Sequence, residues 1–463
     1  MLPTKIVVIG AGSASFGLNT LGSLLRSQHL RGSHLALVDL NAQALEQMGR
    51  LAERSNREWG AGMSISTHTD HRQALSGAKF VVLSIEVPPR EVFWRSDFEI
   101  PLKYGVRQPY AENGGPGGFA HAARNIGPIM HITRDMEQLC PDAWLINFTN
   151  PLMRICDAVA RYSQIKVVGL CHQILVGYAM VGKALGEELD IKIPRQFTST
   201  HASPRFIPHY RAVARRAREK LRITAAGLNH FTWMLDVRHP TNDQDLYPLF
   251  TRRWGELPES FEPLTRRVFA DFGLFPIPGD EHLCEYLPWM SDPLTRPWEK
   301  FDLSLYEWDL WANRRLEEQE QIRRLASGEM SLKRLQEQDS EGAVEIIESV
   351  TGAGTQQALA VNLPNRGYIQ NLPEGAIVEV PGVLSDDGVQ GVEVGSLPAP
   401  IAELCRREIS AAQLCVDAAV HGDRQAALQC LLLDPVINDM DLAKQVLDDY
   451  LRAYQDVLPQ FWD

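Results

Sequence analysis

Residues that can bind a metal or transfer a proton follow short apolar runs of the sequence. Cys171 and His172 come directly after the run at residues 167–170, and Asn229 and His230 end another. Thiolate and imidazole groups are common metal ligands, but a cysteine with a histidine is also the composition of a nucleophile–base pair. The residue types therefore leave a metal site and a nucleophilic site as alternatives. A histidine that only satisfies a local hydrogen bond is the third possibility.

A second group of candidates lies near the start of the chain, where an apolar run at residues 5–9 enters a glycine-rich turn. Strand, glycine turn and helix form the arrangement that binds dinucleotides, because the start of the helix offers free N–H groups to the pyrophosphate. Ser15 stands where the usual fingerprint has its third glycine. Asp39 is placed to bind the ribose hydroxyls of NAD. The candidate cofactor-binding residues are Gly10, Gly12, Ser13, Ser15, Phe16 and Asp39.

The elements that position these residues alternate between short apolar runs and longer helical patterns. This alternation predicts an α/β fold with a Rossmann-like, doubly wound and mainly parallel sheet. Ligands bind at the carboxyl ends of the strands in such sheets, so the candidates are expected at one edge. We expect strands at residues 5–9, 35–38, 80–85, 143–147 and 167–170, and helices that include residues 41–56 and 120–138.

The pattern changes after residue 172. We therefore predict an NAD-binding domain at residues 1–172 and a second, mixed α+β lobe for catalysis, substrate binding and oligomerisation at residues 173–463. A basic stretch at residues 205–222 is interpreted as a solvated helix face or an oligomer contact. We also expect a pair of surface helices within residues 307–338, strands within residues 362–383, and two or three helices after residue 400.

Composition excludes several classes of protein. The 463 residues carry 46 basic and 58 acidic side chains, a net charge of −12, which argues against a nucleic-acid partner. No apolar run is long enough to span a membrane, and the N-terminus lacks the pattern of a signal peptide. Seven cysteines without a C-x-x-C pair are typical of a reducing compartment, so a cytoplasmic protein is expected.

Taken together, the motifs resemble glycoside hydrolase family 4, the NAD- and divalent-metal-dependent glycosidases. The resemblance implies that Cys171 and His230 hold the metal, usually Mn²⁺, and that Asn150 and Asn229 bind the substrate, a small glycoside. A homodimer or homotetramer is expected. The segments that carry the resemblance are residues 5–17, 115–118, 147–151, 169–172, 227–230, 362–369 and 378–381.

The resemblance also implies a reaction. NAD⁺ oxidises C3 of the sugar, a base removes the C2 proton, the aglycone leaves by elimination, water adds and the hydride returns. Residues 279–286 resemble the subgroup that acts on unphosphorylated α-glycosides, so Asp280 is the expected base and Tyr286 the alternative. His172 follows the metal cysteine and is the expected acid.

One feature departs from the family pattern. Cys171 and His230 are separated by 59 residues (230 − 171), more than the resemblance leads us to expect, and His201 in the extra segment is a competing ligand. The sugar stays open among gluco, galacto and uronic substrates. Alternative functions are an NAD-dependent 2-hydroxy acid dehydrogenase and a non-catalytic nucleotide-binding protein. Candidate partners for an anionic substrate are Arg90, Arg95, Arg107 and Arg124.

Overall fold

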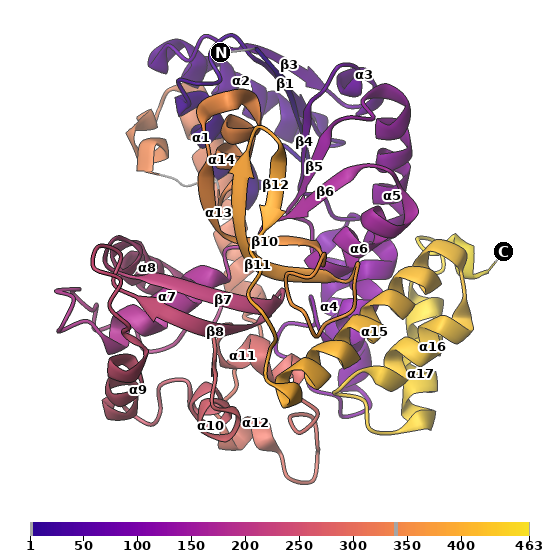
Figure 1. Cartoon of the computed structure of the whole chain (residues 1–463). Coiled ribbons are helices and arrows are strands. Elements are labelled where there is room, and N and C mark those ends of the chain that lie inside the picture. The colour runs from indigo at the N-terminus through magenta and orange to yellow at the C-terminus, as the bar shows by residue number, and fades with distance from the viewer. Residues whose placement is uncertain (1–2, 338–340, 463) are drawn as a thin grey trace.

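The computed structural model describes residues 3–337 and 341–462, except for the side chains of residues 14–17, 334, 336 and 337. One sheet of 12 strands runs through the molecule in the order β3-β2-β1-β4-β5-β6-β10-β11-β7-β8-β9, with β12 beside β11 (Figure 1). The strands are β1 (Lys5–Ile9), β2 (His34–Val38), β3 (Ser64–His68), β4 (Phe80–Leu83), β5 (Trp144–Asn147), β6 (Lys166–Gly169), β7 (Arg222–Leu228), β8 (Phe231–Arg238), β9 (Phe275–Pro276), β10 (Gln356–Pro364), β11 (Ile377–Ser385) and β12 (Gly388–Gly391).

The first six strands are parallel, and their order, 3-2-1-4-5-6, is that of dinucleotide-binding domains. In β1, Val7 and Ile9 enter one apolar core, and Ile6 and Val8 enter the core on the opposite face. A strand buried on both faces has this uniformly apolar sequence. The predicted Rossmann-like fold is therefore confirmed. The prediction missed β3, because its sequence, Ser-Ile-Ser-Thr-His, contains no apolar run.

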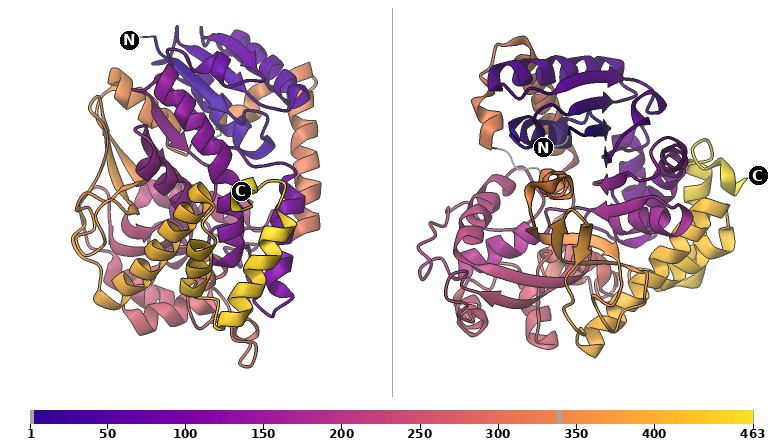
Figure 2. Two further views of the ribbon diagram at one scale, coloured as in Figure 1. Left: turned by 90° about the vertical axis from the view of Figure 1, so that its right-hand side faces the viewer. Right: turned by 45° about the horizontal axis from the view of Figure 1, so that its top comes forward.

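Helices cover both faces of the sheet. On one face α1, α2, α13 and α14 pack together, and on the other α5 and α6 pack against α15 (Figure 2). The helices are α1 (Ala14–Arg26), α2 (Ala42–Trp59), α3 (Arg72–Leu75), α4 (Arg90–Leu102), α5 (Gly115–Leu139), α6 (Leu152–Tyr162), α7 (Ile174–Ala184), α8 (Ile207–Lys220), α9 (Tyr247–Glu256), α10 (Pro263–Phe272), α11 (Asp280–Leu283), α12 (Pro297–Lys300), α13 (Trp308–Ser327), α14 (Ala343–Glu348), α15 (Ala399–His421), α16 (Arg424–Leu433) and α17 (Met440–Ala453).

The second half of the chain extends the same sheet instead of building a separate one. Strand β10 pairs antiparallel with β6, and the strands beyond it are antiparallel as well. The mixed character predicted for this lobe is confirmed. The boundary after residue 172 lies three residues beyond the last parallel strand and stays a prediction.

Two further predictions can be compared with the helices. The three helices after residue 400 are present as α15, α16 and α17. The predicted pair of surface helices is wrong in its second member. Helix α13 ends at Gly328, which has a φ of 89°, and only a short 3-10 segment follows at Leu332–Glu337. Residue 338, at the end of that prediction, lies outside the described residues. Within residues 3–337 and 341–462, no helix has the length and apolar character of a membrane span.

Candidate active site

A row of paired residues joins the parallel and antiparallel parts of the sheet. Gly169 of β6 pairs with Asn362 of β10, Asn362 pairs with Glu379 of β11, and Glu379 pairs with Gly227 of β7. Neither glycine has room for a side chain. A Cβ at Gly169 would lie 2.8 Å from the Cys156 sulfur, and a Cβ at Gly227 would lie 2.6 Å from the Phe231 carbonyl oxygen. The glycines therefore allow the four strands to meet at close range.

This row brings Cys171 and His230 together. Cys171 lies two residues beyond Gly169, and His230 lies three residues beyond Gly227, in the two-residue turn between β7 and β8. The sulfur of Cys171 is 3.3 Å from Nε2 of His230. Sulfur and nitrogen ligands of one zinc-sized ion are about 3.1–3.6 Å apart, so the pair has the spacing of two ligands on one metal.

The backbone of His230 is held in an uncommon conformation. Its φ is 63°, in the left-handed region that costs a non-glycine residue about 1 kcal/mol or more. The Gln173 side chain accepts a hydrogen bond from the His230 backbone amide at 3.1 Å. The chain between Cys171 and His230 thus ends in a fixed turn that places the imidazole beside Cys171.

The two side chains differ in how close their protonation states are to those of metal ligands, which are a thiolate and a neutral imidazole. Burial, followed by the Glu379 carboxyl, raises the pKa of Cys171 to about 12, so this residue is a thiol until a cation displaces its proton. Burial, followed by the charge of His172, lowers the pKa of His230 to about 3. The imidazole is therefore neutral, as a ligand must be. The buried Nδ1 of His230 has no hydrogen-bond partner among the described residues.

Glu379 organises the neighbourhood of this pair. Its Oε2 accepts hydrogen bonds from the amide nitrogens of Asn229 and Asn362, both at 2.9 Å. Burial raises the pKa of Glu379 to about 7. The amide oxygens of both asparagines are buried and lack hydrogen-bond partners in the described part of the chain. Hard oxygen donors of this kind suit Mn²⁺ and sugar hydroxyls. Asn229 was predicted at this place, whereas the role of Glu379 was not.

Aromatic rings extend the site on the far side of His230. The imidazole of His282 stacks on that of His230 at 4.3 Å between ring centres, and His282 in turn lies 4.4 Å from the Tyr110 ring. The Tyr110 hydroxyl is 2.9 Å from Nδ1 of His201. His201 thus reaches the site through Tyr110, and no contact recorded for the described residues links it to Cys171. Neither Tyr110 nor His282 was predicted as a site residue from the sequence.

His172 forms an ion pair with an acidic residue next to the Cys171–His230 pair. Its Nδ1 is 3.4 Å from Glu341, and Glu341 lies 3.7 Å from Arg211 of α8. Cys171 and His172 line one end of a cavity of about 750 Å³, whose wall includes Arg211 and Arg215. The extra segment between Cys171 and His230 therefore contributes α8 to this wall. A role for His172 as an acid stays a prediction.

Asp280 is the first residue of α11, and its buried carboxylate lies against the start of α10. Its two carboxylate oxygens accept hydrogen bonds from the backbone amides of Leu264 and Thr265, at 2.8 and 2.7 Å. Burial, then the carboxyls of Glu262 and Glu281, raise the pKa of Asp280 well above its ordinary value. High proton affinity suits a general base, but the side chain also caps a helix, which the sequence did not reveal. Asp280 stays a prediction for the base.

Tyr286, the alternative base, is buried as well. Its ring stacks on Phe231 at 5.3 Å, directly after the His230 turn, and burial raises the pKa of Tyr286 well above its ordinary value. A Cβ on Gly114 would lie 3.4 Å from this ring. Tyr286 thus packs between Gly114 and Phe231 of β8. Both Asp280 and Tyr286 can be tested as the base.

The glycine turn after β1 has the features of a dinucleotide site. Gly10 has a φ of 87°, and a Cβ there would lie 1.9 Å from the Ser84 carbonyl oxygen. The Gly12 amide donates to Asp39 at 2.8 Å, and Ser13 precedes α1 without capping it through its side chain. The first amides of α1 thus have no side-chain cap from Ser13, as a pyrophosphate site requires. The side chains of Ser15 and Phe16 lie outside the described residues.

Asn150 follows β5, at the same edge as Cys171. Its carbonyl oxygen accepts a hydrogen bond from Asn125 of α5 at 3.3 Å, and Asn125 also accepts from the Val87 amide at 3.0 Å. The loop after β4, helix α5 and the end of β5 are thus connected. These hydrogen bonds fix the Asn150 backbone at this edge of the sheet, and the contact of its side chain with substrate stays a prediction.

The four arginines named above as candidate partners for an anionic substrate all have partners in the chain. Arg124 is 3% exposed and forms two short hydrogen bonds with the buried Asp97. Arg90 pairs with Glu86 at 2.5 Å, Arg95 with Glu99 at 2.8 Å, and Arg107 donates to the Leu303 carbonyl at 2.6 Å. Arg124 and Asp97 form a closed buried pair, so Arg124 is the least suited to bind a substrate anion.

Comparison with known proteins agrees with this geometry. Residues 5–187 match the model of family 4 glycosyl hydrolases, and residues 225–437 match the model of the C-terminal domain of that family. The chain is 32% identical to an alpha-glucosidase of Erwinia rhapontici, with 98% of each chain covered. It is 30% identical to an alpha-galactosidase of Bacillus subtilis (strain 168), with 99% of each covered.

A solved structure shares the fold. It is a 6-phospho-alpha-glucosidase from gut microorganisms in complex with NAD and Mn²⁺, which has 20% sequence identity and a TM-score of 0.79 over 99% of this chain and 100% of that one. Family 4 enzymes depend on NAD and a divalent metal. Neither a 2-hydroxy acid dehydrogenase nor a non-catalytic nucleotide-binding protein is favoured by these matches. The chain therefore belongs to family 4 of the glycosyl hydrolases and is a glycosidase.

Proposed function

We propose that this protein hydrolyses α-glycosides of unphosphorylated hexoses or hexuronic acids, with NAD⁺ and Mn²⁺ as cofactors. The observation that carries the proposal is the distance of 3.3 Å between Cys171 and His230, two residues that the sheet register brings together from distant parts of the chain. Two curated relatives are named alpha-glucosidase and alpha-galactosidase, without reference to a phosphorylated sugar, which supports the substrate class.

The residues of the site suggest a division of roles. Cys171 and His230 would hold the metal, and Asn150 and Asn229 would bind the sugar. When bound, NAD⁺ supplies an acceptor for the C3 hydride and the metal supplies Lewis-acid stabilisation of charge on the C2 and C3 oxygens. Asp280 would accept the proton from C2.

His172 would donate a proton to the leaving oxygen, since its ring lines the cavity beside Cys171 and is 42% exposed. At the other end of the site, the glycine turn at Gly10 and Gly12 would bind the pyrophosphate. Asp39 would bind the adenosine ribose, although it already accepts from the Gly12 and Asn41 amides. A carboxylate has acceptor capacity for both.

The proposal can be tested with p-nitrophenyl α-glucoside, α-galactoside and α-galacturonide. We expect turnover of at least one substrate, and only with NAD⁺, Mn²⁺ and a thiol reductant present. The thiol keeps Cys171 reduced, because an oxidised sulfur no longer binds the metal. Full activity after removal of NAD⁺ and of all divalent metal would contradict the proposal.

We also propose that the chain works as a homodimer or homotetramer in a reducing, cytoplasmic compartment. Seven free cysteines at described positions support the compartment. The basic face of α8, which a solvated surface or an oligomer contact would explain, is the candidate contact. Light scattering coupled to size-exclusion chromatography gives the mass directly, and a monomer of 51.9 kDa at micromolar concentration would contradict the oligomer.

A further inference from the structure

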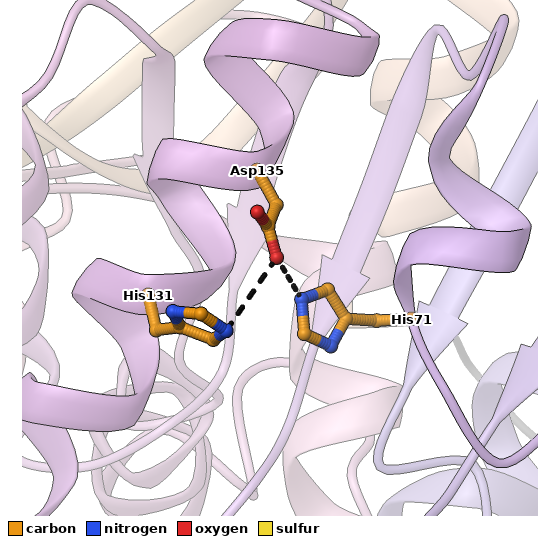
Figure 3. Close-up of side chains that lie close together, drawn as sticks. All are labelled: His71, His131 and Asp135. Carbon is orange, nitrogen blue, oxygen red and sulfur yellow. Dashed lines mark hydrogen bonds and ion pairs between the residues drawn. The ribbon is translucent and has the colours of Figure 1, made fainter.

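Three potential metal ligands meet at the surface of the nucleotide-binding half. His131 and Asp135 lie one turn apart on α5, and His71 directly precedes α3. One ligand atom of each residue lies within 4.8 Å of those of the other two. Figure 3 shows both imidazole rings directed at the same oxygen of the Asp135 carboxylate. None of these residues belongs to the candidate cofactor turn or to the proposed glycosidase site.

We propose that His71, His131 and Asp135 bind a divalent transition-metal ion such as Zn²⁺. Nε2 of His71 is 2.7 Å from Oδ2 of Asp135, and Nε2 of His131 is 3.6 Å from the same oxygen. The nitrogen and oxygen ligands of a tetrahedral zinc ion are about 3.3 Å apart, which lies between these two distances. A bound ion would replace the hydrogen bond between His71 and Asp135 after small side-chain movements.

The surroundings of the three residues favour a single orientation of the carboxylate. Arg72 forms an ion pair with Oδ1 of Asp135, so Oδ2 is the oxygen that faces the two imidazoles. The Asp135 side chain is only 4% exposed, whereas that of His131 is 66% exposed. The carboxylate is therefore fixed, and the ion can approach from solvent on the side of His131, where water completes its coordination.

The donor set selects the kind of metal. Two imidazoles and one carboxylate suit Zn²⁺, Ni²⁺ and Cu²⁺, which bind nitrogen ligands more tightly than Mn²⁺ does. The positive charge of Arg72 offsets the negative charge of the Asp135 carboxylate. The site therefore carries no net negative charge and should not concentrate Mg²⁺ or Ca²⁺. We therefore expect a metal at this place that differs from the one beside Cys171.

The site is remote from the proposed reaction. His131 lies 16 residues beyond Gly115, the first residue of α5, which corresponds to about 24 Å along the helix. The backbone on both sides is anchored, because Ala74 and Leu75 of α3 and Met136 of α5 are fully buried. An ion here would link α3 to α5. Its expected effect is on thermal stability and not on the chemistry at Cys171.

The experiment measures bound zinc per chain after equilibrium dialysis of four proteins: wild type, Cys171→Ser, His131→Ala and the surface control His239→Ala. His131 is mostly exposed, so its replacement leaves the fold intact. We expect Cys171→Ser and His239→Ala to keep the ion at His131, and His131→Ala to bind it at least tenfold more weakly. Zinc should also raise the melting temperature of Cys171→Ser, but not that of Cys171→Ser with His131→Ala.

The alternative results overturn the inference. If His131→Ala binds as many zinc ions as wild type and with the same affinity, the three residues are not the ligands. If the only zinc bound by wild type disappears in Cys171→Ser, the metal is confined to the site of the proposed reaction. A single zinc ion that wild type binds, that Cys171→Ser keeps and that His131→Ala loses would support the surface site. The proposed Mn²⁺ site at Cys171 is tested separately, by Mn²⁺ binding, so the two proposals fail independently.

Discussion

Replacement of Glu379 by glutamine tests the electrostatics beneath the proposed metal site. Glu379 is 2% exposed, and its recorded side-chain partners are the two uncharged amides of Asn229 and Asn362. Burial raises its pKa from 4.5 to about 7. At about 1.4 kcal/mol per pH unit, this difference corresponds to about 3 kcal/mol between the protonated and ionised forms.

The direction in which stability changes with pH depends on whether the folded or the unfolded state holds the proton more tightly. The folded protein keeps the proton on Glu379 to higher pH than the unfolded chain does, so folding takes up a proton between pH 4.5 and 7. The stability that wild type has near pH 4.5 therefore falls as the pH rises, and it stays low above pH 7. Glu379→Gln cannot ionise and avoids this loss, while its amide oxygen still accepts hydrogen bonds from both asparagines.

Urea unfolding at pH 5, 6, 7 and 8 measures this effect in protein freed of metal with a chelator, since a nearby cation would favour the ionised carboxyl. Relative to wild type, the free energy of unfolding of Glu379→Gln should rise by up to about 3 kcal/mol across this range. Glu374→Gln, an exposed glutamate five residues earlier, is the matched control and should follow wild type. A difference between Glu379→Gln and wild type that does not change with pH would refute the reasoning.

Three substitutions test individual parts of the site. Cys171→Ser should weaken Mn²⁺ binding about tenfold or more in equilibrium dialysis and leave NAD⁺ binding unchanged, and Cys140→Ser is the control. Equal Mn²⁺ affinity in wild type and Cys171→Ser would reject Cys171 as a ligand. Gly12→Ala adds a methyl group 2.8 Å from the Asp39 carboxylate and should weaken NADH binding, measured by fluorescence, about tenfold. Gly127→Ala, where the methyl group meets nothing within 4 Å, should bind NADH like wild type, and equal affinities for all three proteins would contradict the cofactor site. Asp280→Asn loses one of two hydrogen bonds to α10, which should lower the free energy of unfolding, measured in urea, by about 1–2 kcal/mol. The same substitution should stop proton removal from C2 of the sugar, and normal exchange at C2 would exclude Asp280 as the base.

The parallel half of the fold could be predicted because most of its strands can be recognised from the local sequence alone. A strand buried on both faces is a short, uniformly apolar run, and β1 and β4 are of this kind. Strand β3 was missed because it lies at the edge of the sheet and has only partly buried or exposed positions. The continuation of the sheet into β10 was not predictable either, since it rests on a pairing between residues 169 and 362.

Some residues of the candidate site could likewise be predicted from the local sequence, and others could not. Cys171 and His230 could be selected because their residue types allow metal chemistry and the resemblance to family 4 assigns them to the metal; the structure places them 3.3 Å apart. Glu379 and His282 were missed because each is an ordinary polar residue until the sheet register and ring stacking place it beside His230. The capping of α10 by Asp280 depends on a helix that begins 17 residues earlier in the chain, which residue spacing does not reveal.

Solvent exchange at C2 of the sugar tests the central claim most directly. Hydrolysis is proposed to proceed through oxidation at C3 and removal of the C2 proton, with the metal bound by Cys171 and His230. When an aryl α-glycoside is hydrolysed in D₂O with NAD⁺ and Mn²⁺, the released sugar should carry deuterium at C2, as NMR and mass spectrometry can show. Complete hydrolysis with no deuterium at C2 would contradict the account.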